Sequence, residues 1–226
     1  MILQNGCSIV ISLCIPTFNR GSLLFHCLKS ITEQDVFQNS EEVEVVVSDN
    51  ASEDWTGRIV DFFVQQYPDK IRYHRNETNI RDKNFEKVLS LGRGTYLKLI
   101  NDSFLLTRDS LKEMLAFIKE YSGKKPPLFW GNTEARGGDR LYCSSLDDFV
   151  SHASYYTTWT GTFGIWREHF EKIEDFSFYA DKHLAQAEVL LKSVASHGAA
   201  VIYNRRFCHV QHVWKKRWLQ CGRGFW

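Results

Sequence analysis

The chain has 226 residues and a mass of 26.4 kDa, a length that accommodates one domain or at most two. Hydrophobic residues make up 43% and charged residues 24%, as in soluble globular proteins, and four prolines and 14 glycines exclude collagen-like and low-complexity classes. The net charge is +1, but residues 203–226 hold six of the 28 Lys/Arg and none of the 27 Asp/Glu, so a mildly acidic body ends in a basic tail.

Apolar runs separated by helical patterns predict alternating strands and helices in the first half. The predicted strands are Ile9–Ile15, Val43–Val47 and Tyr96–Ile100, near-continuous apolar segments that suit a parallel sheet covered on both faces. Because Met1–Arg20 has no basic n-region and its apolar run is broken by Ser12 and Pro16, we interpret it as a strand rather than a signal peptide. No run reaches 18 apolar residues, so no membrane span is predicted.

Helices are predicted between these strands. Helical spacing of apolar residues follows Asn19, Ser52 and Thr107, with Ser52 as the expected N-cap of the second helix, and a shorter helix includes Phe85 and ends near Gly92. The alternation of strands and helices predicts an α/β fold with right-handed crossovers and a mostly parallel sheet.

The second half is less regular. Short strands are predicted at 128–130, 140–143, 163–166 and 199–203. One helix, marked by Leu184, Ala187, Leu191 and Val194, is predicted to end at Gly198. The polar segment 131–139 is predicted to be an exposed loop.

Polar residues follow each of the three main strands. The three clusters are Thr17, Asn19 and Arg20; Asp49, Asn50 and Ser52; and Asn101, Asp102 and Ser103. Ligands of open parallel sheets bind outside the carboxyl ends of the strands, so the clusters are predicted to converge on one crevice. The alternative, that these residues are only caps and turn formers, stays open, because Asn, Asp and Ser favour both.

Three nucleotide-related or hydrolytic motifs are missing from the sequence. It contains no GxGxxG after the first strand, no GxxxxGK[ST] and no GxSxG. Dinucleotide-dependent dehydrogenases, P-loop NTPases and α/β-hydrolases are therefore disfavoured. Any nucleotide must be held by side chains and by backbone at the strand ends.

Five segments resemble the motifs of family 2 glycosyltransferases in order and spacing: Ile11–Arg20, Val46–Asp54, Asn76–Arg81 with Asn84, Gly94–Tyr96, and Leu99–Phe104. The resemblance spans residues 9–118, and 163–166 and 181–195 are similar to the bacterial abequosyltransferase-like branch that builds surface polysaccharides. The resemblance implies the GT-A (Rossmann-like) fold. It divides the chain into a nucleotide-sugar-binding half at 1–120, an irregular acceptor-binding half at 121–202 and a basic, aromatic tail at 203–226.

The resemblance implies an enzyme, an inverting, hexosyltransferase-type glycosyltransferase. Its donor would be a nucleotide-diphosphate sugar, and its acceptor a saccharide, either lipid-linked or part of a cell-surface polysaccharide such as lipopolysaccharide or capsule. The implied location is cytoplasmic and peripheral at the inner face of the plasma membrane. Two alternatives stay open: a non-catalytic relative that binds a nucleotide sugar or polysaccharide, and a membrane-associated assembly protein.

The resemblance also implies roles for the residues of the donor site. Pro16, Thr17, Asn19 and Arg20 would line the nucleotide. Asp49, in the base-binding turn with Asn50, would accept a hydrogen bond from the N3–H of uracil or thymine, because a carboxylate is an acceptor-only group. Arg81 would lie near the diphosphate, where a guanidinium makes bidentate contacts.

A divalent cation, Mg²⁺ or Mn²⁺, is the implied cofactor. The family's metal-binding motif holds two or three carboxylates, but here it reads Asn101, Asp102, Ser103, with a single carboxylate. Mg²⁺ often takes one or two carboxylates plus substrate phosphates, so the metal site stays possible, with His209 and His212 as compensating ligands. A zinc site made of Cys208, His209, His212 and Cys221 is a weaker alternative because its spacing fits no standard pattern.

Inverting transfer needs a general base beside the acceptor hydroxyl. Asp181 matches the family's position before a helix and is the first candidate, ahead of Glu188 and His183; alternatively Asp181 is an N-cap. Three tryptophans, Trp130, Trp159 and Trp166, form either an acceptor platform or part of the core.

The tail interleaves basic residues with Trp214, Trp218 and Trp226. This combination suits an anionic membrane surface. Nucleic acid is not an expected partner, because the body is not basic.

Overall fold

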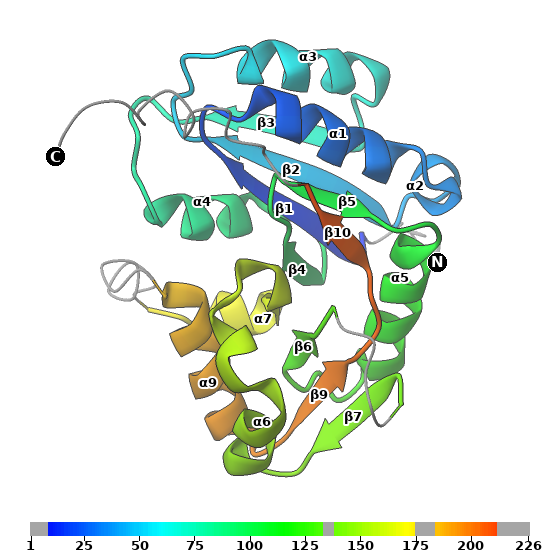
Figure 1. Ribbon diagram of the computed structural model, residues 1–226, viewed down its shortest axis with the longest axis vertical. Helices are drawn as coiled ribbons and strands as arrows, with labels where there is room; N and C mark the ends of the chain where they lie inside the picture. The colour runs from blue at the N-terminus through cyan, green and yellow to red at the C-terminus, as the bar shows by residue number, and fades with distance from the viewer. Residues whose placement is uncertain (1–8, 133–137, 175–183, 212–226) are drawn as a thin grey trace, which may run out of the picture.

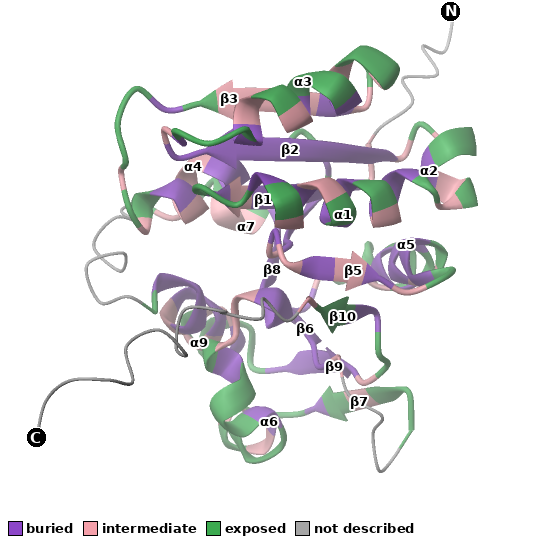
Figure 2. Ribbon diagram, turned by 45° about the horizontal axis from the view of Figure 1, so that its top comes forward, coloured by how far each residue is buried: buried purple, intermediate pink, exposed green. Residues whose placement is uncertain are grey.

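The computed structural model describes residues 9–132, 138–174 and 184–211. Its centre is a five-stranded sheet in the order β3-β2-β1-β4-β8 (Figure 1; β8 is labelled in Figure 2). The strands are β1 (Ile11–Thr17), β2 (Val43–Asp49), β3 (Ile71–Arg75), β4 (Tyr96–Leu99) and β8 (Gly164–Trp166). The first four run parallel and β8 runs antiparallel to β4, which confirms the predicted α/β class.

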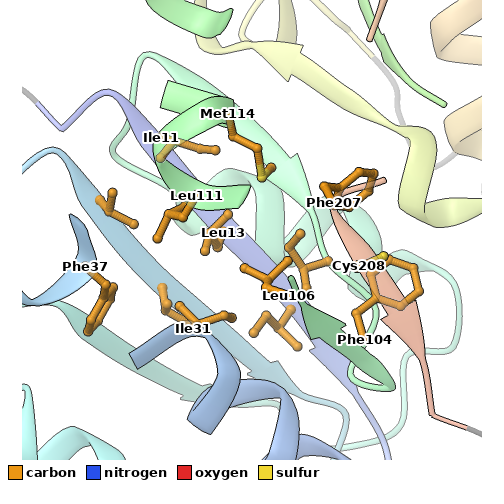
Figure 3. Close-up of a cluster of buried hydrophobic side chains, with 14 of the residues drawn as sticks. Ile11, Leu13, Ile31, Phe37, Phe104, Leu106, Leu111, Met114, Phe207 and Cys208 are labelled. Atoms are coloured by element: carbon orange, nitrogen blue, oxygen red, sulfur yellow. The ribbon is translucent and has the colours of Figure 1, made fainter. Parts of the chain in front are cut away.

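Helices cover both faces of this sheet, which explains why its strands are near-continuously apolar. Ile11, Leu13 and Ile15 face one core layer, while Cys14 faces the other. The first layer contains α1 (Gly21–Thr32), α3 (Thr56–Gln66) and α5 (Ser110–Tyr121); Figure 3 shows side chains of this layer. The second layer contains α4 (Lys83–Leu91), α6 (Leu146–Ala153) and α9 (Ala185–His197). Figure 2 shows β2 buried along its length between these layers.

The second half adds two small sheets. One has the order β6-β9-β7, from β6 (Leu128–Trp130), β7 (Arg140–Cys143) and β9 (Ala200–Tyr203), close to the predicted strands. The other pairs β5 (Phe104–Leu106) with β10 (Cys208–Val210) in antiparallel register. The remaining elements among the described residues are α2 (Asp35–Asn39), α7 (Arg167–Phe170) and two 3₁₀ turns, η1 (Ser154–Thr158) and η2 (Thr160–Thr162).

The β5–β10 pair brings the C-terminal side of the described chain next to the third polar cluster. Val210 is the register partner of Phe104, and the Gln211 backbone N–H donates to the Ser103 carbonyl at 2.8 Å. Segments separated by about half the chain therefore lie side by side at the carboxyl end of β4.

Of two predicted helix ends, one is confirmed and one is wrong. Gly198 ends α9 in the left-handed region at φ 76°, as predicted, because glycine has no Cβ to oppose that conformation. The prediction that Ser52 caps the second helix is wrong: α3 begins at Thr56, and the Thr56 N–H donates to Asp54 Oδ1 at 2.9 Å. Ser52 Oγ instead accepts the Asn19 N–H at 2.8 Å, so it joins two loops.

Within the described ranges, none of the helices combines the length and the apolar character that crossing a bilayer demands.

Candidate functional site

The three polar clusters meet at the carboxyl edge of the sheet. Thr17 and Asp49, which end β1 and β2, are register partners, and the Asn50 N–H donates to the Thr17 carbonyl at 2.9 Å. Thr17 Oγ1 in turn donates to Asp102 Oδ2 at 2.9 Å. We call the surroundings of these residues the carboxyl rim; its convergence is what the strand-end pattern predicted.

Asp102 is the acidic group at the centre of the rim and is only 3% exposed. Its Oδ1 accepts a charge-assisted hydrogen bond from an Arg20 guanidinium nitrogen at 3.1 Å. Burial raises the pKa of Asp102, while the Arg20 charge and the Thr17 hydroxyl act in the opposite direction. Arg20 itself is half-exposed, so its guanidinium can also face a ligand.

The loops of the rim hold unusual backbone conformations. Asn19, Ala51 and Arg81 have φ values of 52°, 64° and 53°, in the left-handed region that non-glycine residues seldom adopt. Asn19 is held by side-chain contacts, since its Oδ1 accepts the Glu53 N–H at 2.8 Å. Such strain clusters at ligand-binding sites, where the surrounding structure enforces it.

Asp49 has a different environment from the one expected. It is 0% exposed, its Oδ1 accepts the Ser52 N–H at 2.9 Å, and its Oδ2 accepts the Tyr73 hydroxyl at 2.8 Å. Arg75 Nε lies 3.8 Å from Oδ2. The expected direct contact with a nucleobase N3–H is therefore not available in this conformation: the carboxylate is occupied in holding the turn after β2.

Asn50 links the second strand end to the loop before α4. Its Oδ1 accepts the Ile80 N–H at 2.8 Å, and its Nδ2 donates to Asn79 Oδ1 at 2.7 Å and to the Arg81 carbonyl at 3.3 Å. Asn76 Nδ2 adds a contact to Asn50 Oδ1 at 3.2 Å. These bonds fix the backbone of Arg81, whose side chain is exposed at the rim.

Sequence reasoning missed Tyr73 and Arg75 as members of this network. Both follow from the position of β3, a strand that the apolar pattern barely marks because only Ile71 in it is fully buried. Recognising that β3 pairs with β2 would have placed Tyr73 and Arg75 beside the second polar cluster.

The predicted metal ligands are only partly assembled. Asn101 Oδ1 accepts the Ser103 N–H at 3.0 Å and the Ser103 hydroxyl at 2.7 Å, so Ser103 closes a turn beside Asp102. His209 is exposed on β10, opposite Leu105 of β5. His212 lies outside the described residues. In the described part of the chain, the one group of three metal-ligand side chains is Cys143, Asp148 and His152 on β7 and α6, away from the rim.

The alternative zinc site loses support. Cys208 is buried in the core, whereas the adjacent His209 is exposed. Neighbouring residues of a strand point to opposite faces, so these two cannot bind one ion from β10. Cys221 lies outside the described residues.

Of the three candidate general bases, the structure describes one. Asp181 and His183 lie outside the described residues. Glu188 is on α9, half-buried, and pairs with Lys192 at 3.0 Å.

Two of the three predicted platform tryptophans are core residues. Trp130 Nε1 donates to Tyr96 Oη at 3.0 Å and Trp166 Nε1 donates to the Pro126 carbonyl at 2.7 Å, and both side chains are fully buried. The platform prediction is therefore wrong for Trp130 and Trp166, because neither offers a ring face to a ligand. Trp159 is only partly buried and lines an open hollow with Tyr155 and Tyr156.

A buried lysine joins the two halves behind the rim. Lys98 of β4 is 0% exposed, and its Nζ donates to the carbonyls of Leu99, Gly161 and Phe163 at 2.9, 2.6 and 3.1 Å. The aromatic faces of Trp130 and Phe207 lie 5.6 and 5.2 Å from the ammonium. Burial lowers the pKa of Lys98 to about 7.

Comparisons of the sequence with known proteins identify its family. Residues 12–174 match the model of the family "Glycosyl transferase family 2". The chain is 34% identical over 131 residues to abequosyltransferase RfbV of Salmonella typhimurium, covering 58% of this chain and 38% of that protein. It is 31% identical over 112 residues to the GalNAc(5)-diNAcBac-PP-undecaprenol beta-1,3-glucosyltransferase of Campylobacter jejuni, covering 49% and 35%.

Solved structures show the same fold. S. aureus TarS 1-349 in complex with UDP aligns with a TM-score of 0.68 at 19% identity, covering 88% of this chain and 59% of that one. Mannosyltransferase PcManGT from Pyrobaculum calidifontis, in complex with GDP-Man and Mn²⁺, aligns with a TM-score of 0.66 at 19% identity, covering 93% and 59%. The chain spans little more than a third of the length of the two curated relatives. The match over residues 12–174 and the shared architecture show that the chain belongs to glycosyl transferase family 2 and has the GT-A fold.

Proposed function

We propose that this protein transfers a sugar, with inversion, from a nucleotide-diphosphate donor to a saccharide acceptor. The observation that carries the proposal is the contact of Thr17 and Arg20 with Asp102, which joins the ends of β1 and β4 at the rim. The bound UDP and GDP-Man of the structurally similar TarS and PcManGT support a donor of this class.

The diphosphate of the donor lies against the exposed guanidinium groups of the rim in this proposal. Arg20 and Arg81 are both exposed there, and a planar guanidinium makes bidentate contacts with phosphate oxygens. Asn19 and Pro16 line the same side, next to Thr17. Asp49 and Asn50 act through the turn that they hold rather than by direct contact with the base.

The residues of the rim fit a divalent cation that shares its ligands with the substrate. Asp102 offers carboxylate oxygens as ligands, whereas the Asn101 amide oxygen is engaged by Ser103 and holds the turn beside it. Mg²⁺ is commonly held by one or two carboxylates plus substrate phosphates. Asp102 would hold the cation once Arg20 turns to the diphosphate. When bound, the cation neutralises charge on the departing diphosphate. The Mn²⁺ in the PcManGT complex supports this use of a metal.

The acceptor is a saccharide that is lipid-linked or part of a surface polysaccharide. The names of two relatives support this class: an abequosyltransferase and a glucosyltransferase that acts on an undecaprenol-linked saccharide. A lipid-linked acceptor agrees with a peripheral location at the inner face of the plasma membrane. Asp181 is the proposed general base, with Glu188 as second candidate.

Donor turnover by a panel of nucleotide sugars tests the proposal. We expect one donor to be hydrolysed or transferred by the wild type, and Asp102→Asn to lower the rate at least ~100-fold, the loss typical of a group that stabilises developing charge. Asp69→Asn, at an exposed turn at the opposite end of β3, is the matched control and should leave the rate unchanged. Equal rates for wild type and Asp102→Asn would overturn the proposal.

A non-catalytic nucleotide-sugar-binding relative is the second candidate. The observation that favours it is that the single carboxylate of the motif is engaged by Arg20 and Thr17. Calorimetry with UDP, with and without Mn²⁺, separates the two candidates when it is combined with the turnover assay. Binding without turnover of any donor would favour the second.

A further inference from the structure

We propose that the open hollow lined by Tyr155, Tyr156 and Trp159 is the subsite that binds one uncharged pyranose ring of the saccharide acceptor. The other lining residues are Gly131, Asn132 and Thr158. This inference rests on the proposed function, since it names where and how the acceptor is held.

The hollow has the size of a small-molecule site. Its volume is about 500 Å³, within the range of roughly 300–1,000 Å³ that ligand pockets occupy. It lies between the end of β6 and the turns η1 and η2, on the second half of the fold.

The lining has the chemistry that recognises sugars. Tyr155 and Tyr156 are stacked, with ring centroids 4.4 Å apart and an interplanar angle of 27°, and yet are 69% and 40% exposed. Exposed aromatic side chains that lie together often mark a binding site. A tyrosine combines an apolar ring face with a polar hydroxyl. These two features match the C–H face and the hydroxyl groups of a pyranose.

Charge favours a neutral ring over other ligands. None of the six described lining residues carries a charge, so this part of the hollow presents no ionic partner for a phosphate or a carboxylate. Asn132 contributes a polar group: its Oδ1 accepts the backbone N–H groups of Phe207 and Cys208 at 2.9 and 3.0 Å. With that oxygen engaged, its amide N–H groups are the donors that remain for a hydroxyl.

The hollow adjoins the carboxyl rim. The Trp159 ring packs on Phe104 with centroids 5.1 Å apart, and Phe104 follows Asp102 by two residues. Gly161 lies so close that a Cβ added to it would come within 2.5 Å of the Phe104 ring. A sugar ring in the hollow therefore lies next to the segment that carries the proposed donor-binding carboxylate.

Two interactions hold the hollow in its shape before a ligand arrives. The Lys98 ammonium fixes the Gly161 carbonyl at 2.6 Å, just after Trp159. On the other side, Gln186 Nε2 of α9 donates to the Thr158 carbonyl at 3.1 Å. Preorganisation of this kind lowers the entropic cost of binding.

The test uses the full chain saturated with UDP and Mn²⁺ and measures saturation-transfer NMR from protein to ligand. The probes are the methyl pyranosides of glucose, galactose, mannose, rhamnose and N-acetylglucosamine. The variants are Tyr155→Ala, Tyr156→Ala and the double variant, which change exposed side chains. Tyr142→Ala, at a 65% exposed tyrosine on β7, is the matched control.

We expect transfer to the ring C–H protons of at least one pyranoside with wild type and with Tyr142→Ala. The double variant should bind that pyranoside at least tenfold more weakly while its UDP affinity stays within twofold of wild type. Sedimentation should give the same oligomeric state for all proteins.

The inference is overturned if no pyranoside binds the wild type, or if the double variant binds as well as wild type. It is also overturned if the double variant changes only the oligomeric state, because the aromatic face would then bind a second copy of the chain. Failure of the proposed function gives a different result. In that case UDP does not bind and no donor binds or is turned over, whether or not a pyranoside binds.

Discussion

Thr17 Oγ1 donates a 2.9 Å hydrogen bond to Asp102 Oδ2, between two residues that are 85 positions apart in the chain. The bond joins the end of β1 to the turn after β4, which are neighbouring parallel strands. Because Arg20 holds the other oxygen of Asp102, the carboxylate has a defined orientation without any ligand. Its environment therefore controls the pH at which it is charged.

Thr17→Val should shift the acid limb of the pH–activity profile to higher pH. Burial raises the pKa of Asp102, and the Thr17 hydroxyl opposes this, so removing the hydroxyl lets the pKa rise further. Activity that needs the charged carboxylate is lost as pH falls through that pKa. The loss of one buried hydrogen bond should also lower the free energy of unfolding by ~1–2 kcal/mol.

Donor turnover measured from pH 4.5 to 8 checks this expectation. Thr32→Val is the matched control: Thr32 is a buried threonine of α1 whose hydroxyl donates to the Lys29 carbonyl at 3.2 Å. An acid limb that stays in place in Thr17→Val, or that moves equally in Thr32→Val, would contradict the role given to Thr17.

The contribution of Lys98 to the stability of the protein should become more favourable as the pH rises above about 7. Its pKa is lowered to about 7 in the fold from 10.5 in the unfolded chain, so between these values the unfolded chain holds a proton that the folded chain has lost. The contribution of Lys98 to stability then increases with pH, by at most ~1.4 kcal/mol per pH unit. Below pH 7 Lys98 is charged in the folded protein, so the whole free-energy cost of burying its ammonium group opposes folding.

Urea unfolding of wild type and Lys98→Met at pH 6.5, 8 and 9.5 measures this slope. The variant should be less stable throughout, because the carbonyls of Leu99, Gly161 and Phe163 lose their donor, but it should lack the Lys98 contribution to the slope. Lys83→Met, at an exposed lysine of α4, should behave as wild type. Parallel pH dependences for wild type and Lys98→Met would refute the prediction.

Asp49→Ala should destabilise the fold by ~1–3 kcal/mol, since it leaves the Ser52 N–H and the Tyr73 hydroxyl without their acceptor. The Ser52 N–H, the Tyr73 hydroxyl and the Arg75 guanidinium all face this carboxylate. Tyr73→Phe removes one of those partners and should cost ~1 kcal/mol. Urea unfolding gives both values, and the double variant should fall short of their sum.

The milder variant keeps the interpretation testable if Asp49→Ala does not fold. Tyr67→Phe, at a partly buried tyrosine that packs on Phe37, is the control and should change stability by less than Tyr73→Phe. If Asp49→Ala unfolds at the wild-type urea concentration yet loses UDP binding, Asp49 contacts the ligand and does not mainly hold the turn.

Gly161→Ala should destabilise the protein by ~1–3 kcal/mol through overpacking. The added Cβ would lie 2.5 Å from Phe104 Cζ, and a packed aromatic ring cannot yield without moving its neighbour Trp159. Gly123→Ala is the control, because nothing lies within 4 Å of a Cβ there. Thermal unfolding of both variants measures the effect. Equal midpoint temperatures for Gly161→Ala and Gly123→Ala would show that the space beside Phe104 accommodates the added methyl group.

Prediction from the sequence worked where the signal is local and repeated. The strands β1, β2 and β4 and the helices α1, α3, α4, α5 and α9 follow from apolar periodicity, and their order leads to the parallel sheet. Two short strands were not predicted: β5 and β10 have three residues each, and each is a strand because it pairs with the other, distant segment.

The site was predicted as a set of residues but not as a set of contacts. Thr17 and Asp102 were placed at one edge by the rule that parallel strands end together, whereas the buried state of Asp49 depends on Tyr73, which comes from a strand that the pattern did not delimit. The sequence does not distinguish Trp130 and Trp166 from Trp159, yet the first two are fully buried, whereas Trp159 is partly exposed and borders the hollow with Tyr155 and Tyr156.

The sequence by itself therefore determined the family, the order of the main elements and the edge at which polar groups gather. These depend on spacing along the chain and on the chemistry of residues that follow each strand. The tertiary structure alone decided which polar atoms are already engaged, which aromatic rings face solvent and why Lys98 can be buried. Each of these depends on neighbours distant in the chain, and burial and hydrogen bonding are properties of that packing rather than of local residue order.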